Sequence, residues 1–534
     1  MKQRTITVRK TSSIKKSRIL SIDGRSLTTH AIRAFINDPR ARVTIDPAAV
    51  KRIGRSQALL TRETAIRPIY GVNTGFGPMV THIISTSNLA DLQYNLIRGH
   101  AVGMGEPIRE SNVLSAMIVR LNTLARGHSG VSFALVEALC TLINHRITPI
   151  VPEHGAVGTS GDLVQLAHIG LMLIGEGDVM YGGKRQSAAN LFKKLSIKPH
   201  KLEPKEGLSI INGTSMMSGV AALGILDAVR ILNIAVRSGA LALELIHAIS
   251  DLLDPVLHET RPHAGQKEIA RRLRALLKDS ELLSDRTARS SSVEVKDTTH
   301  VTDVHLQDVY SFRCMPQILG AQLDTIERAH QTITIEINST TDNPIIDVEG
   351  GRFLHGGNFH GEYIAMAVDQ VKAALIKLTM LSERRINFFV NRAVNKTFSP
   401  FLNLKQPGLN MGLQGLQFVA TSTTAQSQSL AFPHAIHSIP TNADNQDIVS
   451  MGCDAALIME KVIENAYILL TIELTTLAQA VDATGVEAKL SAPSHALYKM
   501  VRTHMKAVVD DRTLTQDLEQ LRQSIVQDEE FDSI

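Results

Sequence analysis

The stretch from residue 216 to 250 constrains the fold of this 534-residue chain more than any other part of the sequence. Its charged side chains recur at spacings of 3, 7 and 7 residues, at Asp227, Arg230, Arg237 and Glu244. Because an α-helix repeats every 3.6 residues, these side chains share one narrow stripe, and the rest of the helix surface is apolar. A helix that meets water along so narrow a face is buried in a bundle. Residues 361–395 and 452–482 show a similar pattern, so the sequence predicts a mostly α protein built on long central helices.

Shorter helical and strand patterns surround these long segments. Apolar side chains recur at helical spacing over residues 88–98, 110–126, 130–146 and 162–175. Strand-type alternation is scarce, with short candidates near 177–186 and 345–354. Residues 21–70 are expected to form short helices and turns, with Asn37, Asp38 and Pro39 acting together as a breaker.

Changes in composition along the chain suggest four parts. Residues 1–20 hold seven Lys and Arg and no acid, and because they lack an apolar run we expect a solvated basic arm and not a targeting peptide. The other parts are an N-terminal domain over 21–215, a central long-helix bundle over 216–485, and a C-terminal helical segment with an acidic tail over 486–534. Within the bundle, the Ser/Thr-rich residues 284–305 are expected to form a surface loop.

The overall balance of residues excludes several classes of protein. Apolar residues make up 44% of the chain and charged residues 20%, with a formal net charge of +4. That charge is too small to favour nucleic acid or an anionic membrane, and we expect no membrane-spanning helix. The three cysteines, an odd and sparse number, argue against a disulfide framework and fit a reducing compartment. We therefore expect a cytoplasmic protein.

Two glycine-rich turns lie between the expected helices. YGVNTGFG (70–77) has three glycines in eight residues, which predicts a loop that carries an exposed Tyr70 and Asn73. VGTSGDL (157–163) places Ser160 just before an apolar helix. Taken alone, this serine is expected to cap the helix N-terminus, and its spacing does not fit the G-x-S-x-G elbow of serine hydrolases.

These two turns belong to a longer series of motifs. The others are LQYNL (92–96), INGTS (211–215), QDVYSFRC (307–314), TDNP (341–344), HGGNFHG (355–361) and NQDIVSMG (445–452). In this order, and over residues 30–485, they resemble the aromatic amino acid ammonia-lyases and aminomutases, with the pattern nearest to bacterial tyrosine ammonia-lyases. The resemblance implies a mostly α fold, a long central helix bundle of the fumarase/ammonia-lyase type with a smaller N-terminal region that carries the cofactor. It also implies a homotetramer whose active sites combine residues from three subunits.

The resemblance implies a cofactor made from the chain itself. In this family an internal Ala-Ser-Gly cyclises and loses water to give 4-methylidene-imidazol-5-one (MIO), an electrophile that no natural side chain supplies. Here the implied precursor is Thr159–Ser160–Gly161, in which the Gly161 nitrogen attacks the Thr159 carbonyl and Ser160 then dehydrates. Asp162 resembles the family's helper in the dehydration. Thr159 departs from the usual Ala, and its β-branch adds crowding without changing the attacked carbonyl.

The same resemblance gives the other motif residues their implied roles. Tyr70 corresponds to the catalytic base on a mobile loop, Tyr310 to a residue that handles a proton, and Arg313 to the clamp on the substrate carboxylate. The polar residues that hold the MIO oxygen or the carboxylate are Asn212, Gln307 and Asn343, and an aromatic residue beside the MIO and substrate is Phe359.

Structural readings stand beside these roles. Tyr70 could be a buried structural residue, Arg313 part of an ion pair, Asn343 a turn residue before proline, and Phe359 a core residue. His355 and His360 suggest a metal, but no carboxylate or cysteine sits at ligand spacing around them, so no metal is expected.

Two positions bear on the substrate. His100 occupies the place where the family reads the substrate ring, and a Gly-His pair there is closer to histidine-specific than to phenylalanine-specific members. Gln446 points away from histidine, because histidine lyases carry a Glu in the equivalent stretch. An imidazole at His100 can hydrogen-bond a phenol, whereas phenylalanine would leave it unpaired. Tyrosine is therefore the first choice and histidine the second.

The sequence thus predicts a lyase that converts L-tyrosine to trans-4-coumarate and ammonia, with a small-molecule substrate and no nucleic-acid or membrane partner. The alternatives are a histidine ammonia-lyase that forms urocanate, a 2,3-aminomutase, and a non-catalytic relative. A fumarase-type lyase shares the architecture, but its GSSxMPxKxN loop is absent from the sequence.

Overall fold

The computed structural model describes residues 18–286, 298 and 306–532. Most of the predicted basic arm, from residue 1 to 17, therefore lies outside the described residues. The same holds for most of the predicted surface loop over 284–305.

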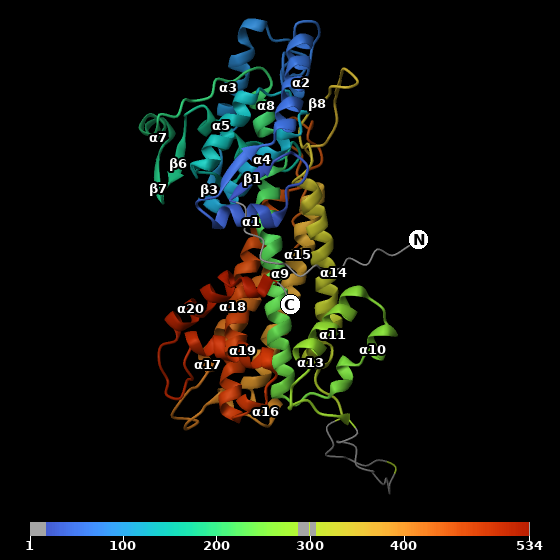
Figure 1. Ribbon diagram of the computed structural model, residues 1–534, viewed down its shortest axis with the longest axis vertical. Coiled ribbons are helices and arrows are strands. Elements are labelled where there is room, and N and C mark those ends of the chain that lie inside the picture. Colours follow the sequence, from blue (N-terminus) through green and yellow to red (C-terminus); the bar gives the residue numbers. More distant parts are fainter. Residues whose placement is uncertain (1–17, 287–297, 299–305, 533–534) are drawn as a thin grey trace.

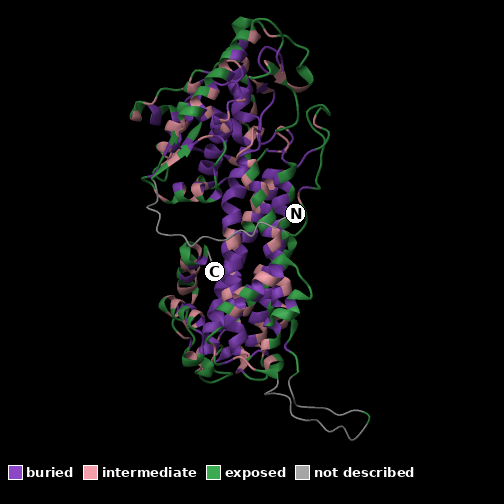
Figure 2. Cartoon of the chain, turned by 45° about the vertical axis from the view of Figure 1, so that its right-hand side comes forward, coloured by how far each residue is buried: buried purple, intermediate pink, exposed green. Residues whose placement is uncertain are grey.

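Four long helices run along one another and form the centre of the molecule (Figure 1). They are α9 (Ser215–Leu245), α14 (Met315–Glu336), α15 (Glu362–Val390) and α18 (Gly452–Thr484). Their buried residues make a continuous spine (Figure 2), which confirms the predicted mostly α bundle. By length and composition α9 could cross a membrane, but 89% of its most apolar window is buried inside this bundle.

Shorter helices cover the lower part of the bundle in Figure 1. They are α10 (Pro255–Glu259), α11 (Ala264–Leu276), α13 (Tyr310–Arg313), α16 (Arg392–Asn395), α17 (Gln414–Ser429), α19 (Ala492–His504) and α20 (Thr515–Gln527).

The N-terminal part forms the upper region of Figure 1. Its helices are α1 (Thr29–Asn37), α2 (Pro47–Thr64), α3 (Leu89–His100), α4 (Glu110–Ala125), α5 (Phe133–Asn144), α6 (Leu163–Leu173), α7 (Ala188–Leu195) and α8 (Glu206–Ile211). The four shorter helices predicted between residues 88 and 175 are thus confirmed as α3, α4, α5 and α6.

The strands are short and pair locally in small sheets. The parallel pair is β1 (Ile19–Ile22) with β2 (Arg42–Ile45). The antiparallel groups are β3 (Met104–Pro107) with β5 (Pro152–His154), β4 (Thr148–Pro149) with β6 (Asp178–Tyr181) and β7 (Lys184–Ser187), and β8 (Ile345–Asp347) with β9 (Arg352–Leu354). The two strand candidates near 177–186 and 345–354 are confirmed.

The prediction of short helices and turns over residues 21–70 was wrong in two respects. The segment contains β2 and the end of β1, which pair in parallel, and α2 is 18 residues long. Asp46 starts α2, because its side chain accepts a hydrogen bond from the Ala48 N–H and Pro47 occupies the first turn. The predicted breaker was right, since α1 ends at Asn37.

Three of the long helices begin at the same end of the bundle. Met217, near the start of α9, packs against Gly361 and Gly452, where an added Cβ would come within 2.5 and 2.6 Å of its side chain. Gly361 precedes α15 and Gly452 begins α18. The positive ends of three helix dipoles therefore converge at one place in the fold.

Candidate active site

The predicted cofactor turn lies where these helix N-termini converge. The Gly158 N–H donates to the Gly161 carbonyl at 3.2 Å and closes a tight turn around Ser160. The Gly361 N–H donates to Gly158 O at 2.9 Å, and the Met451 N–H donates to Val157 O at 3.1 Å. The residues just before α15 and α18 therefore fix this turn in place.

Ser160 does not cap the helix that follows, so that structural reading was wrong. The residue directly before α6 is Asp162, and the side chain there makes no capping hydrogen bond. The Ser160 hydroxyl instead accepts a hydrogen bond from Gln446, which lies 286 positions away in the sequence.

Only glycine fits at position 161. Its φ is +70°, and a Cβ there would lie 2.0 Å from the carbonyl oxygen of Gly213. Two backbone hydrogen bonds hold this close approach: Asp162 N donates to Gly213 O at 2.8 Å, and Gly213 N donates to Ser160 O at 3.2 Å. Because residue 161 has no side chain, nothing on that residue obstructs its nitrogen, which is expected to attack in the cyclisation.

The carbonyl oxygen of Ser160 has two N–H donors. One is the Gly213 backbone. The other is the Asn212 amide, whose nitrogen lies 3.1 Å from Ser160 O in the amide orientation that satisfies both of its ends. In this orientation the Asn212 amide oxygen accepts a hydrogen bond from the Asn343 backbone N–H at 3.0 Å. Two fixed donors on one carbonyl oxygen are the arrangement that stabilises negative charge developing on it.

Asp162 is a buried carboxyl beside this turn. Burial raises its pKa to about 7, although its Oδ2 accepts a hydrogen bond from the Met217 N–H at 2.9 Å. Its Oδ1 is buried and has no hydrogen-bond partner in the described part of the chain. A carboxyl group that exchanges a proton near neutral pH, a glycine without room for a side chain and a half-buried serine hydroxyl fit the chemistry that forms a MIO.

Thr159, the departure from the family pattern, is buried and makes a specific contact. Its hydroxyl donates to Gln446 Oε1 at 2.6 Å, and Gln446 Nε2 in turn donates to Ser160 Oγ at 3.1 Å. The side chain of the first precursor residue is therefore connected to that of the second through Gln446.

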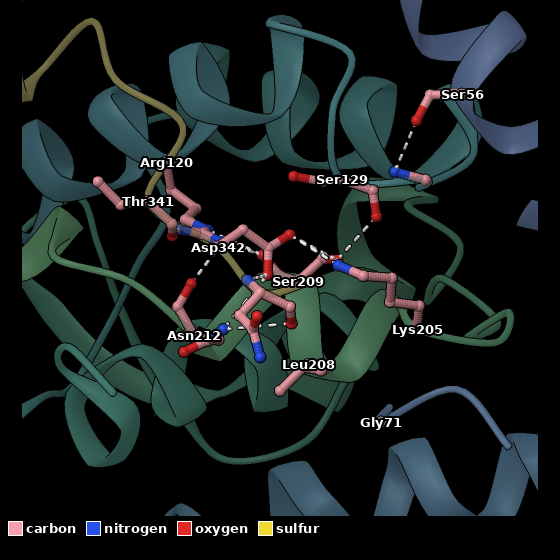
Figure 3. Close-up of polar contacts among 12 residues, drawn as sticks. Ser56, Gly71, Arg120, Ser129, Lys205, Leu208, Ser209, Asn212, Thr341 and Asp342 are labelled. Atoms are coloured by element: carbon pink, nitrogen blue, oxygen red, sulfur yellow. Dashed lines mark hydrogen bonds and ion pairs between the residues drawn. The ribbon is translucent and has the colours of Figure 1, made fainter. Parts of the chain in front are cut away.

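A buried polar network lies behind Asn212 and was not anticipated from the sequence (Figure 3). Lys205 Nζ lies 2.8 Å from Asp342 Oδ2 and 2.9 Å from Ser209 Oγ, and both charged side chains are fully buried. Asp342 Oδ1 accepts from the Asn343 N–H at 2.7 Å. The network therefore fixes the segment that carries Asn343, directly beside Asn212.

Arg120 completes the network from α4. Its guanidinium donates to the carbonyls of Ser209, Asn212 at 2.9 Å and Thr341 at 3.2 Å, and burial lowers its pKa to about 10. A cation at the C-terminal end of α8 complements the helix dipole and satisfies its last carbonyls. The sequence signal for this network was Asp342, the acidic residue of the TDNP motif.

Tyr70 is half-buried on its loop. The Gly77 N–H donates to its phenol oxygen at 3.0 Å, and its ring meets Phe76 and His355 edge-on at 6.4 and 6.3 Å. Gly77 also brings the loop against Asn442, four residues before Gln446, because a Cβ there would lie 2.7 Å from the Asn442 amide nitrogen.

The expectation that Asn73 is exposed was wrong. Its side chain is buried, donates to the carbonyls of Thr64 and Arg67 at 3.0 Å each, and accepts from the Ile69 N–H at 2.6 Å. Asn73 thus anchors the base of the loop to the end of α2, and Tyr70 lies three residues before this anchor.

His100 ends α3, next to the helices that flank the turn. Its Nδ1 lies 2.8 Å from the Leu96 carbonyl, and because that oxygen can only accept, Nδ1 carries the proton. In the neutral ring Nε2 is then an acceptor. Phe359 is half-buried and lies outside the hydrophobic core clusters, two residues before Gly361, so the core reading of this residue was wrong.

Gln307, Tyr310 and Arg313 lie at the other end of α9. The Ile249 N–H, four residues beyond α9, donates to Asp308 at 3.2 Å, whereas Ser160 lies beside the first turn of the helix. A helix of 31 residues is about 46 Å long at 1.5 Å per residue. Within one chain, the fold therefore does not bring these three residues to Ser160.

Gln307, Tyr310 and Arg313 lie at the molecular surface at that end of α9. Tyr310 is 69% exposed, and the Arg313 guanidinium lies 4.9 Å from its ring. Among residues 18–286, 298 and 306–532, Arg313 forms no ion pair, and its Nε is buried without a hydrogen-bond partner. Gln307 and Arg313 line a pocket of about 280 Å³. The structural reading of Arg313 as half of an ion pair is thus not observed.

Across the described residues, no three or more His, Cys, Asp and Glu side chains are grouped so that they could hold a metal ion.

The comparisons with known proteins agree with this geometry. A family model described as aromatic amino acid lyase matches residues 27–503. The histidine ammonia-lyase of Geobacillus thermodenitrificans is 37% identical over 502 residues, which cover 94% of this chain and 96% of that protein. The tyrosine ammonia-lyase of Cupriavidus metallidurans is also 37% identical, over 507 residues covering 93% and 94%. The crystal structure of tyrosine aminomutase from Streptomyces globisporus has a TM-score of 0.90 at 35% identity and covers 96% of this chain and 97% of that one.

The chain belongs to the aromatic amino acid lyase family. It is an enzyme of the carbon–nitrogen lyase class and acts on a small-molecule amino acid. Most of the similar relatives are named histidine ammonia-lyase, at 36–40% identity, but relatives named for tyrosine reach 37–38%, so overall identity does not settle the substrate.

Proposed function

We propose that this enzyme removes ammonia from L-tyrosine without oxidation and releases trans-4-coumarate. The Cβ–H and Cα–N bonds break and a Cα–Cβ double bond forms, so the products balance as the unsaturated acid and ammonia. The proposal rests on the turn at Thr159–Gly161, where Asn212 and Gly213 both donate to Ser160 O. A MIO formed from Thr159, Ser160 and Gly161 would supply the electrophile that takes up the substrate amine.

The chain's own residues account for the remaining steps. Tyr70 would remove the β-proton, and the Gly77 N–H that donates to its phenol oxygen holds that oxygen in place. Arg313 would hold the substrate carboxylate with two parallel hydrogen bonds. Tyr310 would handle a second proton. The remaining proposed substrate contacts are Gln307, Asn343 and Phe359.

The choice of tyrosine rests on the hydrogen-bonding state of two side chains. His100 presents Nε2 as an acceptor, which a phenol O–H satisfies and a phenylalanine ring leaves unpaired. Gln446 is neutral, and its Nε2–H group faces the turn. A carboxylate at this half-buried position would favour an imidazole and disfavour a phenol ring.

Two further activities use the same residues. A histidine ammonia-lyase would also satisfy His100, because an imidazole N–H can donate to Nε2. A tyrosine 2,3-aminomutase would return ammonia to the β-carbon of the bound acid. A non-catalytic relative would keep the fold without the dehydrated turn.

The proposed assembly is a homotetramer in the cytoplasm. Arg313 and Ser160 lie at opposite ends of α9, so a complete site requires the far end of another copy. Tyr363 on α15 and Phe418 on α17 are 75% and 65% exposed, and large exposed apolar side chains of this kind favour association. Cys140, Cys314 and Cys453 are free, as in a reducing compartment.

The test is a substrate panel on purified full-length protein, preceded by intact-mass spectrometry. Loss of two waters from the calculated mass and fastest formation of coumarate support the proposal. A mass equal to that of the plain sequence in active protein would exclude the self-made cofactor, and fastest formation of urocanate would replace tyrosine with histidine. A β-amino acid as the main product would identify an aminomutase.

A further inference from the structure

We propose that the hydroxyl of Thr159 is a positioning group for maturation: through Gln446 it directs an N–H donor onto the hydroxyl that Ser160 must lose. This inference deepens the proposed function and rests on it, because the dehydration matters only if the turn becomes a MIO.

The geometry forms a short relay from Thr159 through Gln446 to Ser160. Thr159 Oγ1 donates to Gln446 Oε1 at 2.6 Å, so that oxygen and not the amide nitrogen faces Thr159. The Gln446 nitrogen must then face the opposite side, where it donates to Ser160 Oγ at 3.1 Å. An alanine at 159 would leave the Gln446 amide free to turn over and present its oxygen to Ser160.

The backbone restrains both ends of the relay. Thr159 is 4% exposed, and its turn is held to Gly361 and Met451 by backbone hydrogen bonds. Gln446 pairs with Thr441 through two backbone hydrogen bonds of 3.0 and 3.3 Å. Since neither end moves freely, the Thr159 hydroxyl supplies the donor that the Gln446 amide oxygen needs when the amide nitrogen faces Ser160 Oγ.

The dehydration of Ser160 explains why a donor is needed at this point. The Cα–H bond breaks and its electron pair forms the Cα–Cβ double bond, while the Cβ–O bond breaks and the hydroxide takes up the proton released from Cα and leaves as water. Negative charge gathers on Oγ as the Cβ–O bond lengthens. A hydrogen bond from a neutral amide N–H strengthens as that charge develops, whereas an amide oxygen would repel it.

This reading also explains the departure from the family's alanine. The β-branch of Thr159 adds crowding to the attacked carbonyl, which alone would slow cyclisation. The hydroxyl on that branch supplies an orienting contact in the following step. Both precursor side chains are used, although only that of Ser160 is consumed.

The experiment follows maturation by mass in the full-length chain after a pulse of synthesis. Thr159→Val keeps the β-branch and removes the hydroxyl, Thr159→Ser keeps the hydroxyl, and Gln446→Leu removes the donor. For Val and Leu, we expect loss of the second water to slow by at least about tenfold, the effect of one hydrogen bond to a charged oxygen, with a one-water-loss species accumulating. Thr159→Ser should mature within about threefold of the wild-type rate, since it keeps that bond.

The double variant Thr159→Val/Gln446→Leu should mature no more slowly than either single variant, because both belong to one relay. Thermal unfolding of each variant identifies loss of fold as a cause. Wild-type maturation of folded Thr159→Val, or a Ser variant as slow as Val, would overturn the inference. If the wild-type chain itself never loses water, both the proposed function and this inference fail. If the chain matures normally but converts none of the tested amino acids, only the choice of substrate fails.

Discussion

Lys205 and Asp342 form an ion pair of 2.8 Å in which neither side chain is exposed to solvent. Breaking a buried pair leaves one charge uncompensated, so Lys205→Met should lower the free energy of unfolding by about 3–5 kcal/mol. Lys205→Met/Asp342→Asn should lose less, because no buried charge remains. Chemical denaturation measures both. The matched control is Lys267→Met, from an exposed pair with Glu259 of 2.7 Å, which should cost less than about 1 kcal/mol. An equal cost for Lys205→Met and Lys267→Met would contradict the expectation.

Asn212→Leu should reduce kcat strongly while leaving the fold intact. The amide nitrogen of Asn212 lies 3.1 Å from Ser160 O, and removal of one such donor costs about 100- to 1,000-fold in kcat. Steady-state kinetics on matured protein measure the effect. Asn190→Leu, on an exposed position of α7, is the control and should leave kcat unchanged. A loss of less than about threefold would show that this amide does not act on the reacting group.

Ser160→Ala should preserve the fold and abolish activity. The side chain is small and half-buried, so its loss removes little packing, but the hydroxyl is the group that the dehydration needs. Intact-mass spectrometry should show no full dehydration, and circular dichroism should show an unchanged melting curve. Full activity in this variant would contradict the proposed cofactor.

Gln446→Glu should raise activity on histidine relative to tyrosine. A carboxylate at this half-buried position pairs favourably with an imidazole and unfavourably with a phenol ring. The measurement is the ratio of kcat/KM for the two substrates, corrected for the matured fraction in each preparation. Gln446→Met, neutral and of similar size, should not favour histidine. An unchanged ratio in the Glu variant would remove Gln446 from the argument for tyrosine.

Asp162→Asn should change the pH dependence of stability. Burial raises the pKa of Asp162 to about 7 in the folded state from an ordinary value of 3.8, so the folded chain holds this proton more tightly than the unfolded chain. Wild-type stability from this group is therefore full below about pH 4 and is lost as pH rises towards 7, by up to about 1.4 kcal/mol per pH unit. The Asn variant lacks that slope. The free energy of unfolding of both proteins is measured at pH 5, 6 and 7, in steps of about one pH unit. The wild-type value should fall relative to that of the variant as pH rises. An equal pH dependence in the two proteins would contradict the raised pKa.

The long bundle could be predicted from sequence because its helices carry their charges on narrow stripes. The stripe of Asp227, Arg230, Arg237 and Glu244 lies on α9 as expected, but Arg230 and Glu244 are buried, so the expectation that the whole stripe meets water was wrong. The parallel pair of β1 and β2 could not be predicted, since each strand has four residues and the two are separated by α1. Four residues are too few to establish an alternating pattern.

The candidate site could be predicted only in part for a related reason. Motif spacing singled out Ser160, Asn212 and Gln446, which the fold brings together around one turn. Buried charges such as Lys205 and Arg120 look like surface charges in a sequence, because their partners are carbonyls and a carboxylate far along the chain. The order of the motifs along the chain likewise did not predict that Arg313 lies at the far end of α9 from Ser160.

That separation along α9 also has a genetic consequence. If sites are shared as proposed, a chain without the Ser160 hydroxyl and a chain without the Arg313 guanidinium are each inactive alone. The two substitutions lie at opposite ends of α9. Co-assembled, the two chains can still form some junctions at which both intact ends meet. Two null alleles would then complement each other in one cell, because the mixed oligomer would regain activity that neither polypeptide has alone.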